Sequence, residues 1–313
     1  MNGTEIIQVI VNTLPSMVAA APVSAIVSSV MARIFLRGNT QTEEFEKLKA
    51  GKMQEVANDL LASGQMTYTE YYKAKNFTDV AEKADEIFAK NQYTVKKEPY
   101  DFDWFIRFYE AVGNISDEDM QDIWAKILAG EINQPHTYSL RLIDVLKNLG
   151  KQEAELFETI CNHTITIGNA TVFPSYKDYL SSCGIMYADM LKMDELGLMR
   201  SMAVNTSYTP SFKGRPVCAY NDNLVLEIKS VDNLKSITVE NYPFTGVGRE
   251  LELVQRHITP DQDVIALAET LKTTRKGLIV SVHQRIPAPE GKISYVSIEM
   301  TTGNQAKETE ATN

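Results

Sequence analysis

The sequence predicts an α+β protein that is mainly α, and three observations lead to this class. Between residues 40 and 163, apolar residues recur at helical spacing and strand signals are nearly absent. After Ile165, short β-branched runs appear, and one helix ends in Leu-Gly-Leu directly before such runs. This layout is typical of a winged-helix unit. We therefore expect an N-terminal helical domain followed by a winged-helix-like α/β unit and a small C-terminal helix plus strand pair.

Changes in composition divide the chain into five expected segments. Residues 1–40 form an apolar N-terminal helical segment, and residues 41–150 form an all-helical domain. Residues 151–258 form the winged-helix-like domain, residues 259–300 a small α/β extension, and residues 301–313 a disordered tail. With 313 residues, of which 44% are hydrophobic, the chain has enough apolar material for a folded core.

Helix-capping patterns support the helical domain. Thr67 and Glu70 stand in capping-box positions. The strongest helix signal runs from Ser116, the expected N-cap, through three acidic residues that suit the helix dipole, to Gly130 as the expected end. Trp104 and Trp124 are expected in the core of this domain.

Composition also restricts the function classes. The formal net charge is −10 and the pI is about 5.1, which disfavours binding to nucleic-acid phosphates. The three cysteines are too few for a disulfide framework and indicate a reducing compartment. The first ten residues lack the basic start of a secretory signal. We expect a cytoplasmic protein, with a peripheral position at the inner membrane as the alternative.

Patterns for catalysis, cofactors and metals are missing. The histidines form no H-x-x-x-H pair, and a zinc site at Cys161 and His163 would need Cys183 or Cys218 to converge from afar, so buried thiols are the simpler expectation. The stretch "TGVGRE" lacks the third glycine of a dinucleotide fingerprint. We read Thr245 as a helix cap at a tight strand-to-helix corner. The expectation is a protein that is not an enzyme and that binds no cofactor or metal.

The expected winged-helix unit raises DNA binding as an alternative function. Its candidate recognition helix, "YADMLKMDELGLM", carries more acidic than basic residues, which suits protein docking better than contact with phosphates. The residues that keep the DNA alternative open are Arg200, Lys213 and Arg215.

The segment "ISDEDMQDIWAKILAGEINQPHTYSLRLIDVLKNLGKQEAELFETI" resembles a bacterial family of domains of unknown function with a Trp-Ala-x-x-Leu-Ala-Gly-Glu-Ile helical core. This family lies near the abortive-infection proteins called Abi-alpha. The resemblance implies a prokaryotic or phage-related protein with an antiviral defence role, and it supplies no reaction. The motif residues that we expect to be structural are Ser116, Trp124, Gly130, Glu131, Ser139, Arg141 and Phe157.

The most unusual stretch is an apolar run without charge from Ile6 to Ala32. Only the ten residues from Val23 to Ala32 lie between Pro22 and Arg33, about 15 Å of helix against a hydrocarbon core roughly 30 Å thick. The alternatives are a helix buried against protein, a membrane-surface or pore-lining segment, and a single span. The residues expected to mediate oligomerisation or membrane contact are Val23, Ser24, Ile26, Val27, Ser28, Val30 and Ile34.

These observations favour a non-enzymatic defence factor over a DNA-binding regulator. The body would dock partner proteins, and the N-terminal helix would self-associate or meet a membrane surface. The expected partners are a second copy of the chain or another protein, and nucleic acid is disfavoured.

Deletion of residues 1–36 is expected to abolish protection of cells against phage while the remaining body stays folded, because the apolar segment would supply self-association or membrane contact. Phage plating, cell fractionation and size determination on full-length and truncated protein check this. Full protection by the truncated form would contradict it.

Overall fold

The structure, a computed structural model, describes residues 61–64, 67–93, 101–201, 207–231, 234–255, 258–289 and 292–297. The chain divides into two compact units between Lys151 and Gln152. The segment expected at residues 1–40 and the tail expected at residues 301–313 lie outside the described residues. No described helix is both long enough and apolar enough to cross a membrane.

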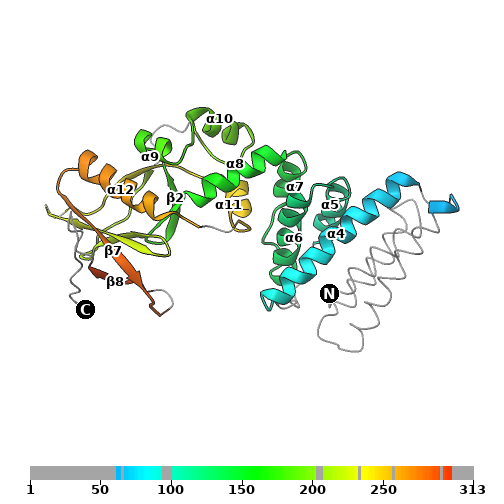
Figure 1. The fold of residues 1–313 in the computed structure, drawn as a ribbon, viewed down its shortest axis with the longest axis horizontal. Helices are drawn as coiled ribbons and strands as arrows, with labels where there is room; N and C mark the ends of the chain where they lie inside the picture. The colour runs from blue at the N-terminus through cyan, green and yellow to red at the C-terminus, as the bar shows by residue number, and fades with distance from the viewer. Residues whose placement is uncertain are drawn as a thin grey trace, which may run out of the picture. The chain divides into compact units, whose positions relative to one another are not determined.

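The regular elements in the described part of unit 1 are all helices. Its helices are α4 (Tyr68–Lys90), α5 (Phe102–Val112), α6 (Glu118–Asn133) and α7 (Leu140–Leu146) (Figure 1). α4 packs along α6 and also contacts α5, which in turn contacts α7. The helix starts are held by side chains: Thr67 and Glu70 form the predicted capping box on α4, Asp101 caps α5 and Ser139 caps α7.

The helix expected from Ser116 to Gly130 begins one residue later and ends further along the chain. Its N-cap is Asp117, whose carboxylate accepts a hydrogen bond from the backbone N–H of Met120 at 3.1 Å. Gly130 lies inside α6, which continues to Asn133. A Cβ at Gly130 would lie 2.8 Å from the hydroxyl of Tyr138. This glycine therefore makes room for an aromatic ring and does not end the helix.

Glu131 ties the end of α6 to the loop that follows. Its side chain is buried, and its carboxylate accepts hydrogen bonds from the backbone N–H groups of His136 (2.6 Å), Thr137 (3.1 Å) and Tyr138 (3.0 Å). Burial raises the pKa of Glu131 above its ordinary value, while the three N–H groups act in the opposite direction. The carboxylate thus holds a loop in which His136 adopts a left-handed conformation, with φ of 66°.

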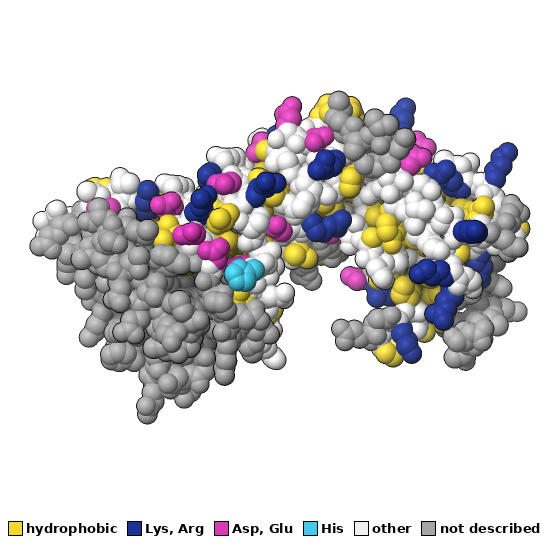
Figure 2. All heavy atoms as spheres, turned by 180° about the vertical axis from the view of Figure 1, so that it is seen from behind, with side chains coloured by type: hydrophobic (Ala, Val, Ile, Leu, Met, Phe, Trp, Pro, Cys, Tyr) yellow, Lys and Arg dark blue, Asp and Glu magenta, His cyan; other side chains and the backbone are white. Residues whose placement is uncertain are grey.

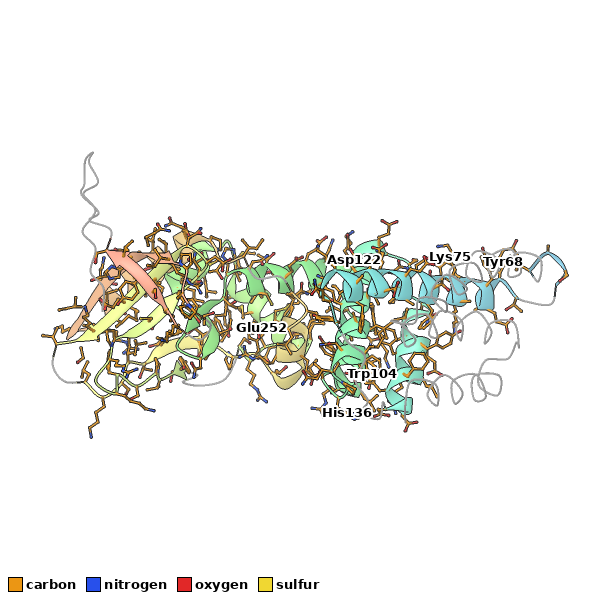
Figure 3. All side chains as sticks on the ribbon, turned by 90° about the horizontal axis from the view of Figure 1, so that it is seen from below. Tyr68, Lys75, Trp104, Asp122, His136 and Glu252 are labelled. Carbon is orange, nitrogen blue, oxygen red and sulfur yellow. The ribbon has the colours of Figure 1, made fainter. Side chains whose placement is uncertain are left out.

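Aromatic rings form the centre of unit 1. Trp104, labelled in Figure 3, stacks on Phe108 with ring centroids 5.0 Å apart, and Phe108 meets the edge of Trp124 at 5.3 Å. Phe77 of α4 meets Tyr109 of α5 at 5.1 Å. Because these contacts join α4, α5 and α6, both tryptophans are core residues, as the sequence predicted.

Unit 2 is built on one eight-stranded antiparallel sheet with strand order β3-β6-β2-β1-β4-β5-β7-β8. The strands are β1 (Ile165–Ile167), β2 (Ala170–Pro174), β3 (Ser207–Tyr208), β4 (Val217–Tyr220), β5 (Leu224–Ser230), β6 (Val239–Tyr242), β7 (Leu278–Ile286) and β8 (Ser294–Ser297). The helices are α8 (Lys151–Asn162), which begins at the division between the units, α9 (Lys177–Ser182), α10 (Tyr187–Glu195), α11 (Gly246–Glu252) and α12 (Asp261–Thr274).

This sheet contradicts the expected winged-helix-like unit and the separate C-terminal extension. β5 pairs with β7 from Leu224 opposite Gln284 to Ser230 opposite Leu278, and β8 continues the same sheet beyond β7. The strands assigned to two different domains therefore form one sheet. The physical reason is that β5 is an interior strand whose backbone groups need a partner on both sides, and the second partner lies far away in the sequence. The chain is an α+β protein with a helical unit and one large sheet.

α12 covers part of this sheet. It packs against β5, β7 and α9. Its buried apolar residues are Val264, Leu267, Ala268 and Leu271, and Leu226 and Ile228 of β5 are also fully buried. Because α12 directly precedes β7, the pairing of β7 with β5 determines where α12 lies.

The corner at "TGVGRE" has the predicted geometry. Thr245 is the N-cap of α11, and its hydroxyl accepts a hydrogen bond from the N–H of Gly248 at 3.0 Å and donates one to the carbonyl of Gly197 at 2.6 Å. A Cβ at Gly248 would lie 1.8 Å from the carbonyl oxygen of Leu198. The glycine therefore permits a close approach of two backbone segments.

Replacement of Glu131 by glutamine is expected to lower the free energy of unfolding by about 1–3 kcal/mol, because an amide offers one acceptor oxygen in place of two. Urea denaturation measures the change. Glu110→Gln, on the exposed surface of α5, is the control and should leave stability unchanged within about 0.5 kcal/mol. Equal stability of the two variants would show that the loop does not depend on the carboxylate.

Replacement of Gly248 by alanine is expected to lower the free energy of unfolding by at least about 2 kcal/mol, because the new methyl group overlaps a backbone carbonyl that cannot rotate away. Gly246→Ala is the matched control in the same helix, since no atom lies within 4 Å of its added Cβ. Thermal and urea unfolding check both variants. A tolerated Gly248→Ala would mean that the corner relaxes without cost.

Candidate functional site

The residues predicted for oligomerisation or membrane contact lie outside the described residues. These are Val23, Ser24, Ile26, Val27, Ser28, Val30 and Ile34. That hypothesis stays a prediction, and the site must be sought in the described part of the chain.

Most motif residues that carry the family resemblance make structural contacts. Trp124 and Phe157 are fully buried, and Phe157 meets Phe244 edge-on with ring centroids 5.7 Å apart. The hydroxyl of Ser139 accepts a hydrogen bond from the N–H of Leu142, the third residue of α7, at 3.2 Å. Two motif residues, Ser116 and Arg141, make no contact of this kind with other described residues, and both are exposed.

The structure brings together two of the three basic residues that kept the DNA alternative open. Lys213 and Arg215 lie on the turn between β3 and β4, where both line one pocket. Arg200 lies outside that pocket, and its backbone N–H donates to the carbonyl of Pro243 at 3.0 Å.

This basic pocket has a volume of about 620 Å³ and is lined by residues 211–216, 229–230 and 234–235. The turn that forms one side is held by backbone geometry. Phe212 is buried, its N–H donates to the carbonyl of Lys235 at 3.0 Å, and the N–H of Arg215 donates back to the carbonyl of Phe212 at 2.7 Å. Left-handed φ angles at Lys213 (42°) and Gly214 (76°) close the turn. The backbone of the basic residues is therefore fixed before any ligand binds.

Four of the described lining residues are cations, namely Lys213, Arg215, Lys229 and Lys235, and none of the described lining residues is acidic. Lys229 forms an ion pair with Glu227 at 2.7 Å. In the part of the chain that the structure describes, the other three form no ion pair. Lysine and arginine side chains lie on the face of unit 2 that Figure 2 shows. The four cations of the pocket are suited to an anionic ligand, although the chain as a whole has a net charge of −10.

Sequence reasoning named Lys213 and Arg215 but missed Lys229 and Lys235. Lys229 lies near the end of β5, and Lys235 follows the loop after that strand. The contacts of Phe212 and Ser211 with the carbonyl of Lys235 bring the two stretches together. These contacts link residues far apart in the sequence, so no local pattern predicts the pocket.

One distant cysteine does approach His163. Cys183 lies beside His163 and Asp263, whereas Cys161 is buried outside this group and Cys218 lies on β4. The carboxylate of Asp263, 2.7 Å from Nδ1 of His163, together with the thiol of Cys183, raises the pKa of the imidazole to about 10. Asp263 was not foreseen, because in the sequence it reads as an ordinary acidic residue in the first turn of a helix.

The described residues form a helical unit and a unit built on one antiparallel sheet, which carries a basic pocket. The chain belongs to a family of proteins of unknown function, DUF2806, which matches residues 62–263. No curated protein and no solved structure matches the chain. The matched range contains every residue that lines the pocket and ends before β7.

Proposed function

We propose that this protein is a non-enzymatic docking protein whose basic pocket binds an acidic segment of a partner protein. The observation that supports this most directly is the set of four cations among the lining residues that the structure describes, none of which is acidic. Carboxylates of the partner would pair with Lys213, Arg215 and Lys235, and such pairs select partners by charge. The fixed turn limits the conformational entropy lost on binding.

An acidic protein segment fits the pocket better than nucleic acid does. Leu234 lines the pocket and its neighbour Val231 is also exposed, so apolar contacts are available beside the cations. The net charge of −10 repels long polyanions at a distance. The alternative of a winged-helix DNA-binding regulator loses its basis, because the eight-stranded sheet contradicts that unit.

The resemblance to Abi-alpha abortive-infection proteins adds a cellular role to this proposal. In that role the protein would be a prokaryotic or phage-related antiviral defence factor, acting in the cytoplasm or peripherally at the inner membrane. The pocket would hold the partner, and the segment without charge from Ile6 to Ala32 would self-associate or meet the membrane surface.

Charge reversal in the pocket tests the docking function. In Lys213→Glu/Arg215→Glu, binding of a fluorescent peptide that alternates Glu and Leu is expected to weaken at least tenfold, about 1.4 kcal/mol, because two attractive charges become repulsive. Fluorescence anisotropy at about 0.1 M salt measures the affinity, since at that ionic strength charges screen each other beyond about 10 Å.

Lys177→Glu/Lys292→Glu is the matched control, because it changes the net charge equally at exposed lysines outside the pocket. It should bind the peptide like wild type. Duplex and single-stranded DNA of equal charge serve as competing probes. Equal weakening in both double variants, or the absence of peptide binding by wild type, would contradict the proposal. Tighter binding of DNA than of peptide would replace the protein partner by nucleic acid.

A further inference from the structure

Three side chains with metal-binding atoms meet in unit 2. His163 directly follows α8, Cys183 is the C-cap of α9, and Asp263 lies in the first turn of α12. Nδ1 of His163 is 2.7 Å from Oδ2 of Asp263, and Sγ of Cys183 is 3.9 Å from Oδ1 of the same carboxylate. The three donor atoms all lie within 4.8 Å of one another. We propose that these residues bind a zinc ion.

The donor set is the first argument for zinc. Zinc accepts sulfur, nitrogen and oxygen ligands together, whereas magnesium and calcium prefer oxygen alone. In a tetrahedral zinc site with bonds of about 2.0–2.3 Å, neighbouring donor atoms lie about 3.3–3.6 Å apart. An ion would therefore separate the imidazole and carboxylate by about half an ångström and bring the sulfur, which lies within 4.8 Å of both, closer to them.

The backbone around the three residues is already fixed. The hydroxyl of Tyr179, which is fully buried, donates to the carbonyl of His163 at 2.6 Å, and the carbonyl of Tyr179 accepts from the N–H of Cys183 at 3.1 Å. The hydroxyl of Thr259 donates to the carbonyl of Thr164 at 2.6 Å, which holds the start of α12 beside the end of α8. The protein itself positions the ligands, as a binding site requires.

The same residue types could form a nucleophilic thiol site, but the geometry favours a ligand set. In a catalytic arrangement the imidazole lies between the nucleophile and the carboxylate. Here the carboxylate of Asp263 presents one oxygen to His163 and the other to Cys183, and the thiol also interacts with the imidazole. The three donor atoms lie within 4.8 Å of one another, as the ligands of one ion must.

The side chains of His163 and Asp263 differ in their exposure to solvent. The side chain of Asp263 is 3% exposed, whereas that of His163 is 18% exposed. Three protein ligands leave one coordination position of a tetrahedral ion for water or an external group, and the exposed side of His163 is where solvent has access. The ion would also join the ends of α8 and α9 to the start of α12. The zinc site shares no residue with the basic pocket, so each can fail without the other.

Metal binding to the full chain tests the site. After treatment with a chelator, the wild-type protein should take up one zinc ion per chain, and cobalt should produce the near-ultraviolet absorption band of a thiolate ligand. Cys183→Ala should weaken zinc binding at least tenfold and remove that band, because it deletes the sulfur ligand. Zinc in hundredfold excess over its Kd should raise the Tm of wild type by several degrees and that of Cys183→Ala by much less.

Cys218→Ala is the matched control, since Cys218 is a half-buried thiol of the same unit outside the cluster. It should bind zinc like wild type. Circular dichroism shows whether each variant keeps its fold, and His163→Gln carries the same expectation should Cys183→Ala unfold. Zinc binding in folded Cys183→Ala or His163→Gln that equals wild type would overturn the proposal. So would the absence of zinc uptake by the wild-type protein, or a cobalt complex without a thiolate band.

Discussion

The pairing of β5 with β7 is the constraint on which unit 2 depends. It supplies the second row of backbone hydrogen bonds for an interior strand, and it continues the sheet to β8. Because α12 directly precedes β7, the same pairing places the first turn of α12, and with it Asp263, beside the end of α9. At its far end β5 finishes with Lys229 and Ser230, which line the basic pocket. One strand pairing therefore helps to position both proposed sites.

Local hydrogen bonds and close backbone contacts fix the loops and corners of the fold. Glu131 holds the loop after α6 through three N–H groups, and Thr245 with Gly248 permits two backbone segments to approach closely. Gly130, Glu131 and Ser139 of the motif that resembles a known family make local contacts of this kind. Such residues are needed where a helix begins, where it ends, or where two backbone segments touch. The motif is thus informative about fold and silent about chemistry.

Charge distribution links the acidic chain to its proposed docking function. A net charge of −10 opposes approach by long polyanions, whereas the cations of the pocket would attract a short acidic segment at close range. Because the chain as a whole repels negative charge and the pocket attracts it, a partner with a few well-placed carboxylates would be favoured over one with many negative charges. Leu234 is exposed beside the cations and offers a contact for an apolar side chain of a peptide. A phosphate backbone has no apolar group to place there.

In the described part of unit 1, the sequence by itself determined the helices and several of their starts, because the spacing of apolar residues and a cap such as Thr67 act over a few neighbouring positions. The same holds for Thr245 at the start of α11 in unit 2. Even in unit 1 the sequence misplaced one cap by a residue, since Asp117 caps α6 in place of Ser116. It also named Lys213 and Arg215, as DNA contacts of the alternative function, and it left Cys183 or Cys218 as the thiol that a zinc site at Cys161 and His163 would need. Only the tertiary structure decided that the C-terminal strands form one sheet and not a winged helix with an extension. It alone brought Lys229 and Lys235 to the pocket, and Asp263 to His163 and Cys183. The reason is that alternation along a strand shows which face is buried but does not name the partner strand, and partners distant in sequence are selected by packing of the whole unit.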